Sequence, residues 1–245
     1  LSTMLKGLKL HTHNITAVVT VADDGGSSGI LRSDLGMLAP GDVRNCVSAL
    51  AEVDPVMGEL LNFRFKDGSL KGHSLGNLFL AALNETSSSF DEAVKKFSHL
   101  TGVVGTVYPV TNESVTLSAL LEDGRLIEGE SHIGVHHDGP KNGIVKLMVN
   151  PEKPKAVDGV IKALEKADII VLGPGSLYTS IIPNLLVDGV VDAIKKSNAV
   201  KIYVCNIMSQ AGETENYTVS DHLAAIERHS YEGIADIVIA NNAII

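Results

Sequence analysis

The sequence predicts a mixed α/β protein with a three-layer, Rossmann-like, doubly wound and mostly parallel sheet. Two patterns predict this class: short runs rich in Val and Ile, and stretches between them that repeat apolar residues every three or four positions. Continuous apolar runs are typical of parallel strands, because helices cover both faces of such a sheet. The predicted strands are 15–21, 167–172, 200–207 and 235–240. The predicted helices are 42–53, 75–83, 90–100, 157–166, 187–196 and 220–227.

The middle of the chain departs from this alternation. The segment 103–133 is rich in Val and Thr, alternates apolar with polar residues, and contains the turn sequence Glu122-Asp123-Gly124. This pattern predicts an antiparallel hairpin. We therefore expect one α/β domain over residues 1–245 with a hairpin insertion at about 103–135, followed by a mobile polar loop at 136–143.

The composition limits the classes of function. The 245 residues, 44% of them hydrophobic, suit one large core. The formal net charge is −9, from 29 acidic and 20 basic side chains, and the basic residues are scattered, which argues against nucleic-acid binding. A phosphorylated ligand remains compatible with this charge, because backbone N–H groups can bind phosphate without a basic surface.

The sequence also bears on location. The two cysteines, Cys46 and Cys205, lie in apolar segments, which argues against a disulfide framework. Apolar runs stay shorter than the roughly 18 to 20 residues of a membrane-spanning helix. We expect a soluble, cytoplasmic protein without membrane contact. The sequence is compatible with a homo-oligomer. The chain begins without methionine and stops directly after a predicted strand, so we expect the native protein to continue at both ends.

The first candidate site follows the strand 15–21 and reads ADDGGSSG. Ligands of open α/β sheets bind at the carboxyl ends of strands. Carboxylates can bind a divalent cation or ribose hydroxyls, and glycines let a ligand approach the backbone. The alternative is a Gly-Ser linker with a turn-forming Asp pair. The expected ligand contacts are Asp23, Asp24, Gly25, Gly26 and Ser27, with Asp24 as the ligand of a magnesium ion.

The second candidate is the segment GDVRN at 41–45. Asp42 is well placed to be the N-cap of the following helix. The helix dipole disfavours arginine in a first turn, so Arg44 and its neighbour Asn45 are candidates to reach an anion or the preceding Asp pair. A surface salt bridge is the alternative for Arg44.

The third candidate, GHSLGN at 72–77, matches the G-x-S-x-G nucleophile elbow of hydrolases. An elbow follows a buried strand, whereas the segment 66–71 is polar and turn-like. We favour a helix N-terminus that offers Ser74 and backbone N–H groups to a ligand, with His73 and Asn77 beside it. For His73 alone, a structural role is the alternative.

The last candidates follow the strands 167–172 and 200–207. Gly173, Pro174, Gly175 and Ser176, with Thr179 behind them, suit a phosphate cradle, although the P-loop lysine and the G-x-G-x-x-G spacing are missing. A structural turn is the alternative. Two amides, Asn206 and Gln210, are candidates to contact a base or a sugar, and 241–242 end the last strand with Asn. We expect these strand ends to line one crevice.

Six segments, in this order, resemble the CofD-like family of 2-phospho-L-lactate transferase-like proteins, and within it the YvcK gluconeogenesis-factor branch. They are ADDGGSSG, GDVRN, GHSLGN, VTNESVTL, GPGSLYTSIIPNLL and CNIMSQAGET. The resemblance spans nearly the whole chain, and Arg32 and Gly36 follow the YvcK-like pattern. Family members usually carry a Gly-Gly-Gly-Thr-Gly loop before the Leu-Ser-Thr helix, which this chain lacks, and Thr-Gln-Pro where it has Ser209-Gln210-Ala211.

The resemblance implies two classes of function. The favoured one is a cytoplasmic, non-catalytic regulator that binds a UDP-sugar and supports growth on gluconeogenic carbon and cell shape. Its diphosphate would lie over 173–176, with Asp23 and Asp24 on ribose or metal and Asn206 and Gln210 on base or sugar. The alternative is a magnesium-dependent transferase that moves a phospholactyl group from a guanosine-diphosphate donor to a deazaflavin alcohol, with Asp24 on the magnesium.

Overall fold

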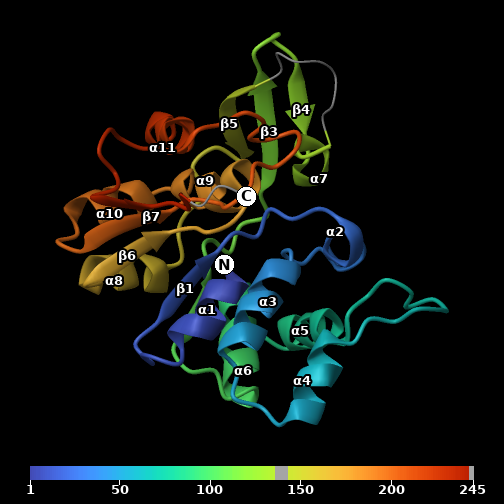
Figure 1. Cartoon of the computed structure of the whole chain (residues 1–245). Helices are drawn as coiled ribbons and strands as arrows, with labels where there is room; N and C mark the ends of the chain where they lie inside the picture. Colours follow the sequence, from blue (N-terminus) through green and yellow to red (C-terminus); the bar gives the residue numbers. More distant parts are fainter. Residues whose placement is uncertain (136–142, 243–245) are drawn as a thin grey trace. The chain divides into compact units, whose positions relative to one another are not determined.

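The chain forms two compact units, Leu1–Ser114 and Val115–Ile245, in a computed structural model that describes residues 1–135 and 143–242 (Figure 1). We call them the N-terminal unit and the C-terminal unit. Both combine helices with parallel strands, which confirms the predicted mixed α/β class. That the whole chain acts as one domain stays a prediction.

The N-terminal unit contains one pair of parallel strands. β1 (Thr16–Val19) pairs with β2 (Thr106–Pro109), and Ala17, Val19 and Val107 are buried. Helices α3 and α6 contact this pair. The helices of the unit are α1 (Ser2–Leu8), α2 (Gly26–Leu35), α3 (Gly41–Leu50), α4 (Pro55–Asn62), α5 (Leu75–Glu85) and α6 (Phe90–Leu100).

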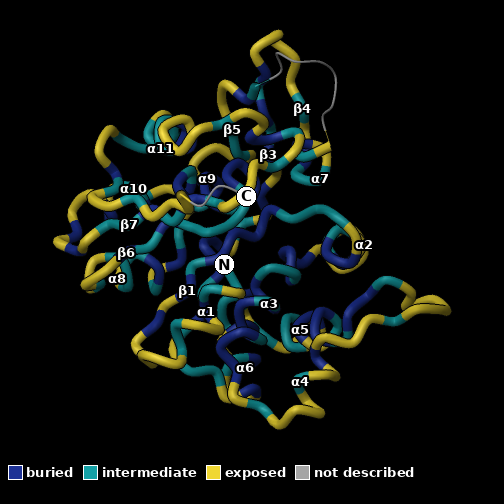
Figure 2. Tube along the Cα trace, in the orientation of Figure 1, coloured by how far each residue is buried: buried dark blue, intermediate teal, exposed yellow. Residues whose placement is uncertain are grey.

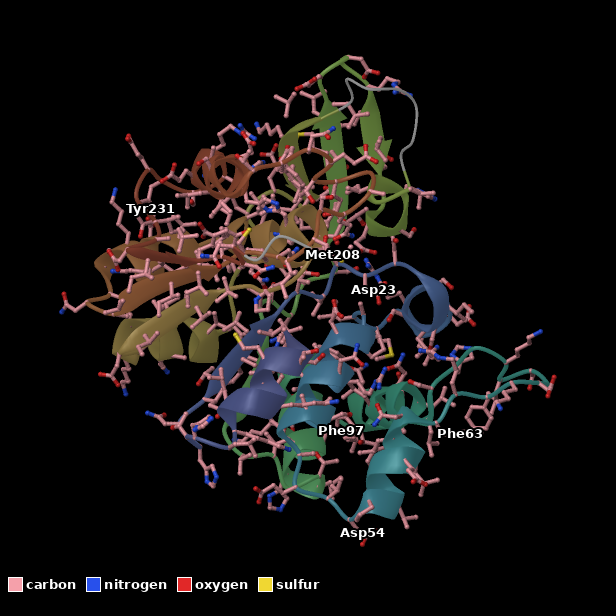
Figure 3. All side chains as sticks on the ribbon, viewed as in Figure 1. Asp23, Asp54, Phe63, Phe97, Met208 and Tyr231 are labelled. Carbon is pink, nitrogen blue, oxygen red and sulfur yellow. The ribbon has the colours of Figure 1, made fainter. Side chains whose placement is uncertain are left out.

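Helix α6 has the predicted bounds and illustrates why the unit folds as it does. Ser89 caps the helix by accepting a hydrogen bond from the N–H of Glu92, which satisfies one of the free donors of the first turn. Phe90, Val94 and Phe97 follow one another at helical spacing and are buried. Figure 2 shows buried stretches along α6 in dark blue, and Figure 3 labels Phe97. Each such side chain contributes roughly 1.5–3 kcal/mol through burial.

The C-terminal unit contains a parallel sheet of three strands in the order β6-β7-β8. The strands are β6 (Ile169–Leu172), β7 (Val200–Val204) and β8 (Ile237–Ile239), inside three of the predicted runs. Between them and before them lie α8 (Asp158–Lys166), the π-helical turn η1 (Leu177–Ile181), α9 (Ile182–Leu185), α10 (Val190–Lys196) and α11 (Val219–Arg228).

The same unit carries an antiparallel sheet in the order β4-β3-β5. Its strands are β3 (Thr116–Leu121), β4 (Leu126–Glu128) and β5 (Ile144–Asn150), with the short helix α7 (Glu130–Ile133) after β4. The turn at 122–124 connects β3 to β4 as predicted, and Gly124 has a positive φ of 86° there.

The predicted hairpin differs from the structure in its first part. β2 belongs to the N-terminal unit and runs parallel to β1, so antiparallel pairing begins only at β3. Alternation of Val and Thr cannot tell a parallel strand from an antiparallel one, because both kinds of strand can show this pattern. The loop expected at 136–143 lies outside the described residues apart from Gly143.

Candidate functional site

The segment after β1 leads directly into helix α2. Asp23 accepts a hydrogen bond from the N–H of Gly25 at 2.9 Å, and Gly25 is the N-cap of α2. The Arg32 guanidinium donates to the carbonyl oxygens of Ala22 and Asp23, both at 3.1 Å. The segment is therefore a fixed turn at a strand end, with Asp23 half-buried (Figure 3), and not a flexible linker.

Asp42 lies close to Asp23, where helix α3 begins. A Cβ on Gly41 would lie 2.6 Å from Ser28 Oγ and 3.0 Å from Asp23 Oδ2, so only glycine lets this helix end approach the turn. Burial, and to a lesser degree the negative charge of Asp23, raise the pKa of Asp42 above its ordinary value. A hydrogen bond with the Asn45 side chain acts in the opposite direction.

The prediction that Asp42 caps α3 is wrong. The N-cap is Pro40, and Asp42 lies one position inside the first turn. An acidic residue there still interacts favourably with the helix dipole. Its carboxylate is not committed to capping, which leaves it available to the site formed with Asp23.

Four buried side chains extend this cluster as a chain of hydrogen bonds. Arg44 Nε donates to Asn77 Oδ1 at 3.3 Å, and Asn77 Nδ2 donates to Ser27 Oγ at 3.1 Å. Ser27 Oγ lies 3.0 Å from His73 Nδ1. The exposed fraction of each of the four side chains is 7% or less. Helices α2, α3 and α5 each contribute to this network.

Arg44 is therefore buried and does not form the surface salt bridge that the sequence left open as an alternative. Its guanidinium donates to Asn77 and, through Nη1 at 2.9 Å, to Asn62 Oδ1. Burial lowers its pKa, and the positive charge of Arg64 adds to this effect. A Cβ on Gly76 would lie 2.9 Å from Arg44 Cδ, so the second glycine of GHSLGN makes room for the arginine.

Ser74 has a capping role. Its Oγ accepts the N–H of Asn77 at 3.2 Å, which makes Ser74 the N-cap of α5, and it is 1% exposed. The preceding chain is a hairpin-like segment in which Arg64 and Ser74 form an antiparallel bridge. This is not the strand-to-helix turn of a nucleophile elbow.

In the C-terminal unit, the segment 173–176 turns directly after β6. Gly173 has a positive φ of 82°, and a Cβ there would lie 2.9 Å from the carbonyl oxygen of Val204. Asn206, after β7, holds this turn with both ends of its amide: Oδ1 accepts the N–H of Gly175 at 3.2 Å, and Nδ2 donates to the carbonyl of Gly175 at 2.8 Å.

A carboxylate that the sequence reasoning missed, Glu213, accepts hydrogen bonds at the start of η1. The Ser176 hydroxyl donates to it at 2.5–2.7 Å, and the Tyr178 N–H donates at 3.1 Å. Gln210 Nε2 donates at 2.7 Å, and Thr179 Oγ1 donates to Ser176 Oγ at 2.7 Å. Glu213 therefore accepts from Ser176, which was expected to hold a phosphate, and from Gln210, which was expected to contact a base or a sugar.

Glu213 is 4% exposed, and this burial raises its pKa above the ordinary value. The hydrogen bonds from Ser176 and from the Tyr178 N–H act in the opposite direction. The only hint in the sequence was a glutamate in the quoted segment CNIMSQAGET. Ser176 and Glu213 are 37 positions apart, so no local spacing relates them.

The predicted residues are divided between the two units. The N-terminal unit contains Asp23, Asp24, Gly25, Gly26, Ser27, Asp42, Arg44, Asn45, His73, Ser74 and Asn77. The C-terminal unit contains Gly173, Pro174, Gly175, Ser176, Thr179, Asn206 and Gln210. Within residues 1–135 and 143–242, no three His, Cys, Asp or Glu side chains converge as a metal site, and no helix is long and apolar enough to cross a membrane.

Three comparisons relate the chain to known proteins. A gluconeogenesis factor from Halalkalibacterium halodurans is 48% identical over 244 residues, 98% of this chain and 74% of that protein. The gluconeogenesis factor of Bacillus subtilis is 45% identical over 245 residues, 99% of this chain and 74% of that protein. A relative from Clostridium acetobutylicum is 52% identical over 242 residues, and the chain spans only 54% of its length.

A solved structure and a family model complete the comparison. A crystal structure of a UPF0052 family member from Bacillus halodurans superimposes with a TM-score of 0.96 at 46% identity, over 100% of this chain and 77% of that one. This agreement confirms the Rossmann-like α/β fold. The family model described as 2-phospho-L-lactate transferase CofD matches residues 1–245. The chain therefore belongs to the CofD family, and its close relatives are gluconeogenesis factors.

Proposed function

We propose that this protein is a cytoplasmic, non-catalytic regulator that binds a sugar nucleotide, of the UDP-sugar class, and supports growth on gluconeogenic carbon and cell shape. The names of the Halalkalibacterium and Bacillus relatives support the gluconeogenic role. We propose UDP-sugar binding and a role in cell shape because the family resemblance of the sequence implies both. The sugar nucleotide supplies a diphosphate, which needs either donors or a cation beside it.

The observation that carries the proposal is the approach of Asp23 and Asp42. The negative charge of Asp23 raises the pKa of Asp42, and a cation shared by the two carboxylates would remove this repulsion. Magnesium commonly takes one or two protein carboxylates and completes its shell with water and phosphate oxygens. Asp23 and Asp42 fit that donor set of two carboxylates. Magnesium would supply charge neutralisation for the diphosphate there.

Calorimetric titration with UDP-N-acetylglucosamine, with and without magnesium, tests the proposal. We expect binding that strengthens with magnesium, and an Asp42→Asn protein that loses most of this magnesium dependence. Asp34→Ala, which removes an exposed carboxylate on α2, is the matched control and should bind like the parent. Equal and weak heats for UDP-sugars, GDP and buffer would contradict the proposal.

The second candidate is a magnesium-dependent transfer of a phospholactyl-type group from a nucleoside diphosphate donor. Its support is the description of the matching family, 2-phospho-L-lactate transferase. In this case Asp23 and Asp42 would hold the cation. The acceptor hydroxyl would lose its proton and form a bond to the phosphorus of the phospholactyl group, while the bond from that phosphorus to the nucleotide breaks and the nucleoside monophosphate leaves. A product assay with a guanosine-diphosphate phospholactate donor and a deazaflavin alcohol distinguishes the two: transfer that Asp42→Asn abolishes would favour the enzyme.

A further inference from the structure

The polar chain of the N-terminal unit begins at a group that can only donate. Arg44 has no hydrogen-bond acceptor on its guanidinium. Its Nε lies 3.3 Å from the Asn77 side chain, so the amide oxygen of Asn77 must face it. The NH2 group of Asn77 is then directed to Ser27 Oγ at 3.1 Å. A buried arginine therefore fixes the orientation of this amide.

The orientation of the Asn77 amide determines the hydrogen-bond directions at Ser27 and His73. Ser27 is 7% exposed, and in the described part of the chain the side chains that hydrogen-bond with its Oγ are those of Asn77 and His73. Asn77 already donates to this oxygen. A buried hydroxyl proton without an acceptor is costly, so the Ser27 hydroxyl donates to His73 Nδ1, 3.0 Å away.

We infer that Asn77 is a positioning residue that holds His73 in the tautomer with the proton on Nε2. Nδ1 accepts from Ser27, and a neutral imidazole carries its single proton on the other nitrogen. His73 therefore presents a hydrogen-bond donor. The group that meets it is an acceptor, such as a phosphate, carboxylate or carbonyl oxygen. This last step rests on the proposed function, because it assumes that the ligand contacts this cluster.

The Asn77→Asp substitution tests the inference because it reverses one hydrogen bond. An aspartate at 77 accepts from both Arg44 and the Ser27 hydroxyl, and Ser27 Oγ can then only accept from His73. We expect His73 Nδ1 to be unprotonated in the parent and protonated in Asn77→Asp. Histidine 15N NMR measures this directly, with a His73→Gln sample to assign the signal.

Asn62→Asp is the matched control. It makes the same change of charge beside the same arginine, since Asn62 Oδ1 accepts from Arg44 Nη1 at 2.9 Å, but it has no bond to Ser27. His73 Nδ1 should stay unprotonated in this protein. A protonated Nδ1 in the parent, or an unprotonated Nδ1 in a folded Asn77→Asp protein, would overturn the inference. If Asn77→Asp does not fold, Ser27→Ala replaces it, and a mixture of both neutral forms is expected.

Titration with UDP-N-acetylglucosamine and magnesium adds the functional readout. We expect at least a tenfold weaker affinity in Asn77→Asp and less than a threefold change in Asn62→Asp. Equal weakening in both proteins would contradict the role of His73 as a donor to the ligand. If the parent does not bind while the NMR result holds, the proposed function fails and the positioning role of Asn77 stands.

Discussion

Two strand-end segments of similar composition, 23–28 in the N-terminal unit and 173–176 in the C-terminal unit, satisfy their polar groups in opposite ways. At 173–176, Asn206 holds the backbone of Gly175, and Glu213 accepts from Ser176 and from the start of η1. At 23–28, the Asp23 carboxylate lies near another carboxylate, Asp42, whose pKa it raises, and the Arg32 guanidinium donates to the backbone carbonyl of Asp23 and not to its side chain. Glycines and hydroxyls at a strand end thus do not show whether the segment meets an internal acceptor, as 173–176 does, or another carboxylate, as 23–28 does; the neighbouring charges do.

The largest effect should follow from removing the internal carboxylate. Glu213→Ala leaves the Ser176 hydroxyl, the Tyr178 N–H and the Gln210 amide without their acceptor, and a buried donor without a partner costs about 1–3 kcal/mol. We expect a loss of roughly 3 kcal/mol in the free energy of unfolding, measured by urea denaturation. The exposed neighbour provides the control: Glu215→Ala should be nearly neutral. A stable Glu213→Ala protein would mean that this turn is held by other contacts.

The two glycines of the turn should respond differently to alanine. Gly173→Ala combines a positive φ of 82° with a Cβ placed 2.9 Å from the Val204 carbonyl, and we expect roughly 2 kcal/mol of destabilisation. Gly175→Ala meets only ordinary contacts, with Ser180 Cβ at 3.4 Å, and should melt like the parent.

If phosphate approaches Gly175, affinity for UDP-N-acetylglucosamine should fall about tenfold to a hundredfold in Gly175→Ala. Unchanged affinity would instead assign 173–176 a purely structural role, as its internal bonds to Asn206 and Glu213 suggest. Thermal melts and titrations of both variants separate these outcomes.

Substitutions of the carboxylates in the N-terminal unit should lower ligand affinity and leave the stability of the protein nearly unchanged. The double substitution Asp23→Ala with Asp24→Ala should weaken magnesium-dependent binding about tenfold or more, with little loss of stability. Unchanged affinity in a folded double variant would remove this cluster from the binding site.

Asp42→Asn should stabilise the protein without ligand at neutral pH, by up to about 1 kcal/mol. The pKa of Asp42 is raised in the folded state, so the folded protein binds this proton more tightly than the unfolded chain does. The corresponding stability is present below the ordinary pKa of 3.8 and is lost as pH rises through the folded pKa. Urea denaturation at rising pH across this range should show a smaller loss in the free energy of unfolding for Asp42→Asn than for the parent.

A smaller effect is expected in the C-terminal unit, where protonation of His229 at acidic pH should lower the stability of the protein. His229 Nε2 accepts the N–H of Leu147 at 2.8 Å, and its Nδ1 donates to the Ala225 carbonyl, so the ring joins β5 to α11 in its neutral form. Burial lowers its pKa below 6.5. This contribution to stability is present above 6.5 and is lost as pH falls through the lower folded pKa. Thermal melts from pH 7 to about pH 5 should fall less steeply in His229→Gln.

The periodic segments show how far the sequence reached. The helix at 90–100 has its predicted bounds, and the strands β6, β7 and β8 lie inside the predicted runs, because burial of an apolar face dictates those patterns locally. Helix α4 was missed: its turns carry exposed Val56, Met57 and Leu60, which blur the amphipathic pattern. Likewise, β2 was assigned to the hairpin because pairing direction leaves no local trace.

The sequence named most residues of the N-terminal hydrogen-bonded chain as candidates but gave no sign of the bonds between them. Ser27, Arg44 and the pair His73 and Asn77 were selected from three separate segments, yet only the fold shows that they form one hydrogen-bonded chain. The sequence placed Ser74 at a helix N-terminus, but its capping role came only from the structure. The predicted capping role of Asp42 was wrong, because Pro40 is the N-cap of α3.

The sequence by itself determined the α/β class, the order of elements and the residue types at the strand ends, since each depends on neighbours within a few positions. The tertiary structure alone decided the charge balance at those ends. Whether a carboxylate meets donors, as Glu213 meets Ser176 and Tyr178, or meets another carboxylate, as Asp42 meets Asp23, depends on segments brought together from distant positions. Electrostatic energy follows distance in space, which no spacing in the sequence encodes.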